Sequence, residues 1–114
     1  MSSSGVQAEQ LAAQFLQQRG LKLLQQNYRC RYGEIDLIMQ DADTVVFAEV
    51  RLRKHSDFGG AAASINATKQ GRLIRAAHHY LAGLAHLPPC RFDAVLLQAL
   101  ESNNIEWIRD AFST

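Results

Sequence analysis

Apolar residues along the chain fall into two stretches with helical spacing and five with the spacing of strands. The first helical stripe consists of Ala8, Leu11, Ala12, Phe15 and Leu16. Because residues three and four apart share one face of a helix, this stripe predicts an amphipathic helix over residues 5–19. Ser4 and Gln7 fit a capping box at its start, and Gly20 is suited to end it.

Three strands are predicted after this helix. Residues 21–28 favour a first strand, and Gly33 beyond it would permit a bulge or a close backbone approach. Residues 35–39 and 45–50 are apolar apart from one acid in each segment. The polar run 40–44 between them suits a chain reversal, so these two segments are predicted to form a β-hairpin.

The hairpin predicts a cluster of charged side chains. If it is symmetric about the peptide bond after Ala42, Asp36 lies across from Glu49 and Glu34 lies across from Arg51. Side chains two apart on a strand share a face, so all four would lie on the same face of the sheet. Like charges facing each other across strands are destabilising. The pair of acids therefore indicates a role beyond folding.

The second half of the chain predicts one more helix and two strands. The helix is expected to begin near Ser64 or Asn66, both suitable N-caps. Its buried stripe would consist of Leu73, Ala77, Tyr80, Leu81 and Leu84. A separate face would carry Lys69, Arg72, Ala76 and His79. Residues 90–97 then predict a strand, and the alternating residues 105–108 predict a short last strand.

The element order α-β-β-β-α-β-β predicts an α/β fold with a mixed sheet, with polar loops over 55–60 and 101–104. At 114 residues, with 47% hydrophobic and 20% charged residues, the chain fits one globular domain over residues 1–114. No apolar run approaches membrane-spanning length, and the polar N-terminus does not resemble a signal peptide. We therefore expect a cytoplasmic protein with no membrane contact, in which Cys30 and Cys90 are free thiols.

Charge is distributed unevenly along the chain, although the net charge is only +1. Residues 51–91 hold seven basic residues and one acid, a net +6, whereas the remainder carries −5. Basic charge gathered on one section attracts a polyanion. A solvated helix face is the alternative explanation for this basic segment.

His78 and His79 are adjacent on the predicted helix and point about 100° apart, so they are expected to be surface or packing residues rather than metal ligands.

The acids of the hairpin suit a divalent metal. Mg²⁺ prefers carboxylate oxygens together with water and phosphate, and Asp36 with Glu49 would present two carboxylates rigidly. Arg51 lies two residues after Glu49 on the same face, where it could contact a phosphate, so metal-assisted phosphodiester hydrolysis is one interpretation. The other is cross-strand ion pairing on a wet sheet face. That arrangement would pair Glu34 with Arg51, and Asp36 with Arg29, Arg31 or Arg53.

At these residues the sequence resembles the YraN family of small bacterial proteins. The resemblance rests on residues 33–38 and 46–51, with Ala8-Glu9, Asn27-Tyr28-Arg29, Phe58-Gly59-Gly60, Lys69, residues 90–93, Trp107 and Ala111-Phe112. It implies a restriction-endonuclease-like αβββαβ core, similar to archaeal Holliday junction resolvases. It also implies that Asp36 and Glu49 occupy metal-ligand positions and that Glu9, on the first helix, completes the metal site.

The chain departs from the wider nuclease superfamily at one position. That superfamily has lysine two residues after the glutamate, whereas this sequence has Arg51. Arginine stays protonated at any ordinary pH, so it cannot act as a general base, but it can hold a phosphate or stabilise transition-state charge. Lys54 and Lys69 are the candidates to replace the missing lysine in space.

The sequence thus predicts a metal-dependent endonuclease for structured or branched DNA, with Mg²⁺ or Mn²⁺ as cofactor. Glu9, Asp36 and Glu49 would bind the metal, and Arg51 would contact phosphate. The nucleic-acid backbone would be held by Arg53, Lys54, Lys69 and Arg72. Resemblance to resolvases implies a homodimer for cutting two strands. The alternatives are an inactive nucleic-acid-binding module with the same fold and a protein-interaction domain whose acids are simply paired.

Overall fold

The computed structural model describes residues 4–52, 65–98, 100 and 105–112. The elements in order are α1 (Ser4–Gln18), β1 (Lys22–Cys30), β2 (Gly33–Asp41), β3 (Thr44–Leu52), α3 (Ala67–Leu81), β4 (Cys90–Leu97) and β5 (Ile105–Phe112). This order confirms the predicted α/β fold and contains the αβββαβ core. Ser64, Arg53, Lys54 and the predicted loops over 55–60 and 101–104 lie outside the described residues.

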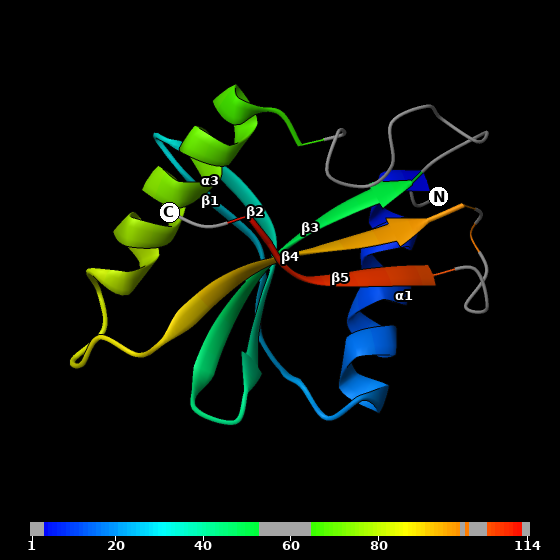
Figure 1. Ribbon diagram of the computed structural model, residues 1–114, viewed down its shortest axis with the longest axis horizontal. Helices are drawn as coiled ribbons and strands as arrows, with labels where there is room; N and C mark the ends of the chain where they lie inside the picture. Colours follow the sequence, from blue (N-terminus) through cyan, green and yellow to red (C-terminus); the bar gives the residue numbers. More distant parts are fainter. Residues whose placement is uncertain (1–3, 53–64, 99, 101–104, 113–114) are drawn as a thin grey trace.

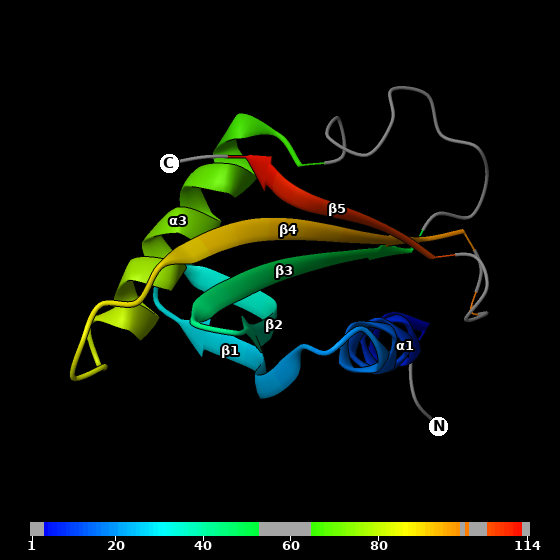
Figure 2. The same ribbon diagram turned by 60° about the horizontal axis from the view of Figure 1, so that its bottom comes forward.

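One five-stranded sheet forms the centre of the molecule, in the order β1-β2-β3-β4-β5 (Figure 1). The β3–β4 pair is parallel and the other three pairs are antiparallel, so the sheet is mixed as predicted. The parallel pair requires a crossover, which α3 provides. Helices α1 and α3 cover different faces of the sheet (Figures 1 and 2).

The β2–β3 hairpin has the predicted register. Its pairs run from Asp41 opposite Thr44 to Leu37 opposite Ala48, which is the symmetry expected about the bond after Ala42. The turn places Ala42 at φ 55°, in the left-handed region. Asp36 and Glu49 are the next residues on each strand beyond the last of these pairs. The two acids therefore stand where the ladder between β2 and β3 ends.

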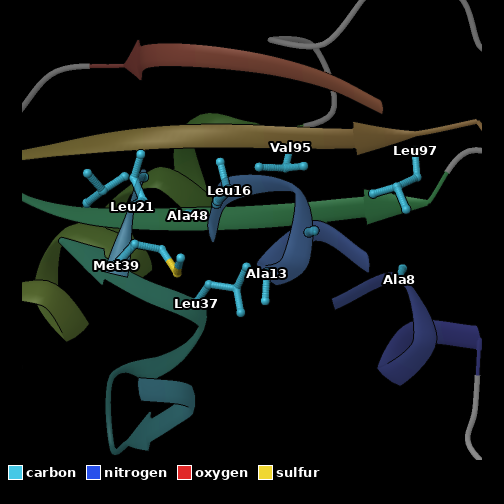
Figure 3. Packing of buried hydrophobic residues seen from close by; sticks show 11 residues of the cluster. Ala8, Ala13, Leu16, Leu21, Leu37, Met39, Ala48, Val95 and Leu97 are labelled. Carbon is cyan, nitrogen blue, oxygen red and sulfur yellow. The ribbon is translucent and has the colours of Figure 1, made fainter. Parts of the chain in front are cut away.

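Helix α1 packs on one face of the sheet through small residues (Figure 3). The buried cluster consists of Ala8, Ala12, Ala13, Leu16, Leu21, Leu37, Met39, Val46, Ala48, Val95 and Leu97. Gly20 ends the helix as predicted, with φ 94°. The Leu21 amide donates to the Leu16 carbonyl at 3.1 Å and the Gly20 amide to Gln17 at 3.0 Å, a Schellman motif. The chain is thereby turned back towards the sheet.

Helix α3 packs on the other face, against Ile38, Val45, Phe47, Phe92 and Ala94. Its N-cap is Asn66, whose Oδ1 accepts from the Lys69 amide at 2.9 Å. The predicted stripe was wrong at two positions. Ala76 is fully buried because it lies one turn after Leu73 on the same face. Leu84 is 38% exposed because α3 ends at Leu81. The Gly83 and Leu84 amides donate to carbonyls three residues earlier, and these tighter turns move Leu84 away from the buried face of the helix.

The last strand is longer than predicted because a buried acid holds it to β4. Asp93 is 0% exposed. Its carboxylate accepts from Trp107 Nε1 at 2.9 Å, from the Asp110 amide at 2.9 Å and from Arg91 Nε at 3.0 Å. These bonds keep β5 in the sheet beyond Ile108, across the polar residues Arg109 and Asp110, where the alternation of apolar and polar residues stops. Phe112 then stacks on Phe92 with ring centroids 4.8 Å apart.

Two further expectations concern the cysteines and the membrane. Cys30 is half-buried, Cys90 is exposed, and both are free thiols as predicted. Among the described residues, no helix is both long and apolar enough to cross a membrane.

Candidate metal and nucleic-acid site

A cavity of about 250 Å³ opens beside the point where the β2–β3 ladder ends. Its lining consists of Gly33, Glu34, Asp36, Glu49, Lys69, Arg72 and Leu73. Strands β2 and β3 supply the acids, and the first turns of α3 supply the cations. The structure thus brings together four residues that the sequence singled out, namely Asp36, Glu49, Lys69 and Arg72.

The two strand acids differ in burial and in surroundings, Glu49 being buried and Asp36 half-buried. Glu49 is 4% exposed. Asp36 Oδ2 accepts from the Val50 amide at 2.9 Å, so its side chain takes the place of the next ladder bond. Burial first, and then the charge of Glu49, raise the pKa of Asp36 from 3.8 to about 7. With this pKa, Asp36 is divided between its protonated and its charged form at neutral pH, and a cation bound beside it would favour the charged form.

Glu9 reaches the same region from α1. Carboxylate oxygens of Glu9, Glu34 and Asp36 all lie within 4.8 Å of one another. Burial is the main cause that raises the pKa of Glu9, and the charges of Glu34 and Glu49 add to it, while a hydrogen bond with Asn27 opposes it. The helix acid that the family resemblance pointed to thus lies beside Asp36.

Glu34 is a candidate ligand that sequence reasoning left out of the metal set. It is two residues before Asp36 on the same strand, and that parity was the signal that could have identified it. Its carboxylate also lies 3.4 Å from Arg29 Nε on β1, an exposed ion pair. Glu34 therefore takes part in a cross-strand ion pair, as the alternative interpretation of the sequence expected, but its partner is Arg29 on β1 and not Arg51 on β3. Among the described residues, no ion pair joins Asp36 to Arg29 or Arg31.

Glu49 is flanked by two cations. Lys69 Nζ lies 2.8 Å from Glu49 Oε1, and Arg51 Nε lies 3.6 Å from the same oxygen. The Asn66 cap fixes the first turn of α3 and so directs Lys69 towards β3. Lys69, one of the two residues considered as a substitute for the missing strand lysine, is therefore placed at the acid pair.

Arg72 forms the outer wall of the cavity, one turn along α3. Gly33 begins β2 with φ 147°, and a Cβ added there would lie 3.6 Å from the Cβ of Arg72. The close backbone approach predicted at Gly33 is therefore an approach to α3. A side chain at Gly33 would have to adopt a strained backbone conformation against the cavity wall.

By fold and site, this is an α/β protein with an acid-lined cavity at the open end of its central hairpin. The chain belongs to the uncharacterised protein family UPF0102, whose model matches residues 8–97, and this confirms the YraN-family resemblance. It is 64% identical to a UPF0102 protein of Nitrosomonas europaea over 110 residues, covering 96% of this chain and 93% of the relative. It is 52% identical to one of Methylobacillus flagellatus, covering 99% of each.

Proposed function

We propose that the protein is a cytoplasmic, divalent-metal-dependent nuclease that hydrolyses phosphodiester bonds in structured or branched DNA. The observation that carries the proposal is the acid pair of the buried Glu49 and the half-buried Asp36, with the amine of Lys69 2.8 Å from Glu49. Burying two carboxylates side by side costs stability unless a cation compensates them. A site of this kind, opening beside basic residues of α3, suits a phosphate ester as substrate.

The donor set fits a hard divalent cation. Mg²⁺ and Mn²⁺ favour carboxylate oxygens and retain water ligands, and Glu9, Glu34 and Asp36 offer three carboxylates within 4.8 Å of one another. Glu49 could join them once Lys69 and Arg51 turn to a substrate phosphate. When bound, such a metal would activate water and stabilise charge on the phosphate oxygens.

The basic residues of the site would position the substrate. Arg51 is permanently protonated and is suited to holding a phosphate through its guanidinium. Lys69 and Arg72 lie on consecutive turns of α3 and face the cavity, so they would contact successive parts of the backbone. All three donate without accepting, which fits an anionic ligand. Cutting two strands requires two such cavities, so the active form is proposed to be a dimer.

A cleavage screen tests the function directly. Branched, flapped and single-stranded DNA would each be incubated with Mg²⁺ or Mn²⁺ and with chelator. We expect metal-dependent cleavage by wild type, and a loss of at least a hundredfold in Asp36→Asn. Asp43→Asn is the matched control, because Asp43 is an exposed acid in the hairpin turn of the same strand pair. Cleavage that survives Asp36→Asn, or that needs no metal, would contradict the proposed site.

The pairing of Glu49 with both Lys69 and Arg51 favours a second candidate, a nucleic-acid-binding module without turnover. In that case Glu49 would serve only to orient two phosphate-binding cations. Salt-dependent DNA binding without cleavage in any metal would support this second function. A salt-insensitive interaction, or none with DNA, would favour the protein-interaction alternative.

A further inference from the structure

A second cavity, of about 370 Å³, lies further along α3 and is lined by Tyr32, Arg75, His78, His79 and Ala82. Its lining residues are neighbours, along the chain and along α3, of residues that line the acid-lined cavity. Tyr32 immediately precedes Gly33 on the chain, and Arg75 lies one turn after Arg72 on α3. None of the described lining residues is acidic. The two cavities thus differ in chemistry, the first acidic and cationic, the second aromatic and basic.

The aromatic rings of the second cavity are held in place from the core. Tyr80 packs edge-on against buried Phe47 at 6.0 Å and against Tyr28 at 5.4 Å between centroids. The Tyr28 hydroxyl is hydrogen-bonded to Nδ1 of His79. The His79 ring in turn lies 6.0 Å from the Tyr32 ring, inclined at 61°. A surface pair of rings is therefore preorganised by contacts that begin in the hydrophobic core.

Cationic groups border these rings. The Arg31 guanidinium lies 4.9 Å from the Tyr32 ring centroid and donates to the Tyr32 hydroxyl at 2.6 Å. Arg75 folds back along α3, with Nη1 3.5 Å from the point where a side chain on Gly71 would begin. Its guanidinium is thereby directed towards the N-terminal end of α3, the end from which Lys69 and Arg72 line the acid-lined cavity. Aromatic platforms interleaved with cations are the combination that binds single-stranded nucleic acid.

We propose that this second cavity binds the base of an unpaired nucleotide next to the scissile phosphate, a subsite that rests on the proposed nuclease function. Tyr32 would stack on the base, His79 would contact the edge of the base because its ring is inclined at 61° to the Tyr32 ring, and Arg75 would contact the phosphate between the two cavities. A volume of about 370 Å³ is at the small end for ligand sites, which suits one nucleoside. A base inside a duplex has both faces covered by its neighbours, so only an unpaired nucleotide can reach these rings. The subsite therefore selects DNA with unpaired nucleotides beside the cleavage point.

The test compares two otherwise identical duplexes in chelator, where no cleavage occurs. One carries a single extrahelical nucleotide, and the other carries an abasic residue at the same position, which keeps the backbone but removes the base. Binding is measured by fluorescence anisotropy. We expect wild type to bind the duplex with the base about tenfold more tightly, as one stacked base provides. Tyr32→Ala and His79→Ala should bind both duplexes alike, whereas Tyr32→Phe should keep the preference.

The outcomes separate the subsite from the proposed function. Equal binding of both duplexes by wild type would overturn the subsite and leave the metal site to be judged by cleavage. A preference that persists in both Tyr32→Ala and His79→Ala would also overturn it, because the base would then be read elsewhere. His79 is exposed, so His79→Ala keeps the test valid if Tyr32→Ala unfolds. Wild type that binds neither duplex would overturn the subsite and the proposed function together.

Discussion

Two aspartates on this sheet, the buried Asp93 and the half-buried Asp36, have opposite surroundings. Asp93 on β4 accepts hydrogen bonds from the Trp107 indole, the Asp110 amide and the Arg91 guanidinium. Asp36 on β2 accepts one described hydrogen bond, from the Val50 amide, and its other neighbours include Glu9 and Glu49. Asp93 accepts from three donors, whereas Asp36 lies among acids that the nearby amine of Lys69 compensates only in part. A buried acid satisfied by the protein itself holds the fold together, and one left among acids is suited to binding an external cation.

The largest expected effect concerns Asp93. Asp93→Ala should lower the free energy of unfolding by about 3 kcal/mol, because it leaves the Trp107 and Asp110 donors without their acceptor and removes one of the two carboxylates that Arg91 contacts, the other being Asp41. Urea denaturation at neutral pH measures this. Glu106→Ala, an exposed acid on β5, is the control and should change stability by less than about 0.5 kcal/mol. A similarly small loss in Asp93→Ala would erase the contrast between the two aspartates.

Asp36 should behave in the opposite way. In chelator, Asp36→Asn should be as stable as wild type or more stable, because it removes a charge that repels Glu49. In thermal melts, Mn²⁺ at a hundred times its dissociation constant should stabilise wild type by about 2.7 kcal/mol and leave Asp36→Asn unchanged. Asp43→Asn should retain the full response. The metal site would be contradicted if Asp36→Asn were less stable than wild type in chelator and the melting temperature of wild type did not change with Mn²⁺.

The pH dependence of stability follows from the raised pKa of Asp36, about 7 against 3.8. Between these values the folded chain keeps a proton that the unfolded chain releases, so rising pH favours unfolding. In chelator, wild type should therefore lose stability relative to Asp36→Asn as pH rises from 4 to 7, by about 3 kcal/mol, with little further loss above that. Urea titrations of both proteins across this range give the difference. A constant difference would mean that Asp36 is charged throughout.

DNA binding should depend on the cations near Asp36 and not on those near Asp93. With roughly four phosphates neutralised, log affinity should fall with log salt at a slope near −4, and Arg72→Gln should reduce its magnitude by about 0.9. Lys69→Gln should reduce the magnitude of the salt slope by a similar amount. Arg109→Gln, whose guanidinium lies over the Trp107 ring, should leave the slope unchanged. Equal effects of all three variants would indicate a diffuse basic surface.

The smallest effect is expected at the cysteines, which are not among the described partners of Asp36 or Asp93. Cys30→Ser and Cys90→Ser together should leave the Mn²⁺ response and the salt slope unchanged, since the thiols are free and unconnected with the acids. Melting curves and anisotropy measure both properties. Loss of either one would show that a thiol contributes to the site.

Local patterns along the chain were sufficient to predict the hairpin but not the whole site. The polar run between the two apolar strands predicted the position of the turn, and a reversal centred after Ala42 sets the β2–β3 register, because the register of a hairpin follows from its turn. Asn66 as N-cap was also predictable from its residue type. By contrast, the contact of Lys69 with Glu49 depends on where α3 crosses the sheet. The extension of β5 depends on Asp93, and neither tertiary contact leaves a periodic signal in the sequence.

The way β3 is held has a mechanical consequence for ion choice. On one side β3 pairs with β4 along its whole length, from Val45 opposite Cys90 to Leu52 opposite Leu97. On the other side its pairing with β2 ends at Ala48, and beyond that point the Asp36–Val50 bond alone spans the two strands among the described contacts. Strand β2 is likewise held on its outer side, because it pairs with β1 on both sides of Asp36, with Ile35 opposite Tyr28 and Leu37 opposite Gln26. Each acid therefore lies on a strand that is fixed on its outer side and unpaired in the ladder on the side that faces the other acid. Because only the Asp36–Val50 bond crosses this gap among the described contacts, its width can follow the ionic radius, and we predict that Mg²⁺ and the slightly larger Mn²⁺ both raise the melting temperature.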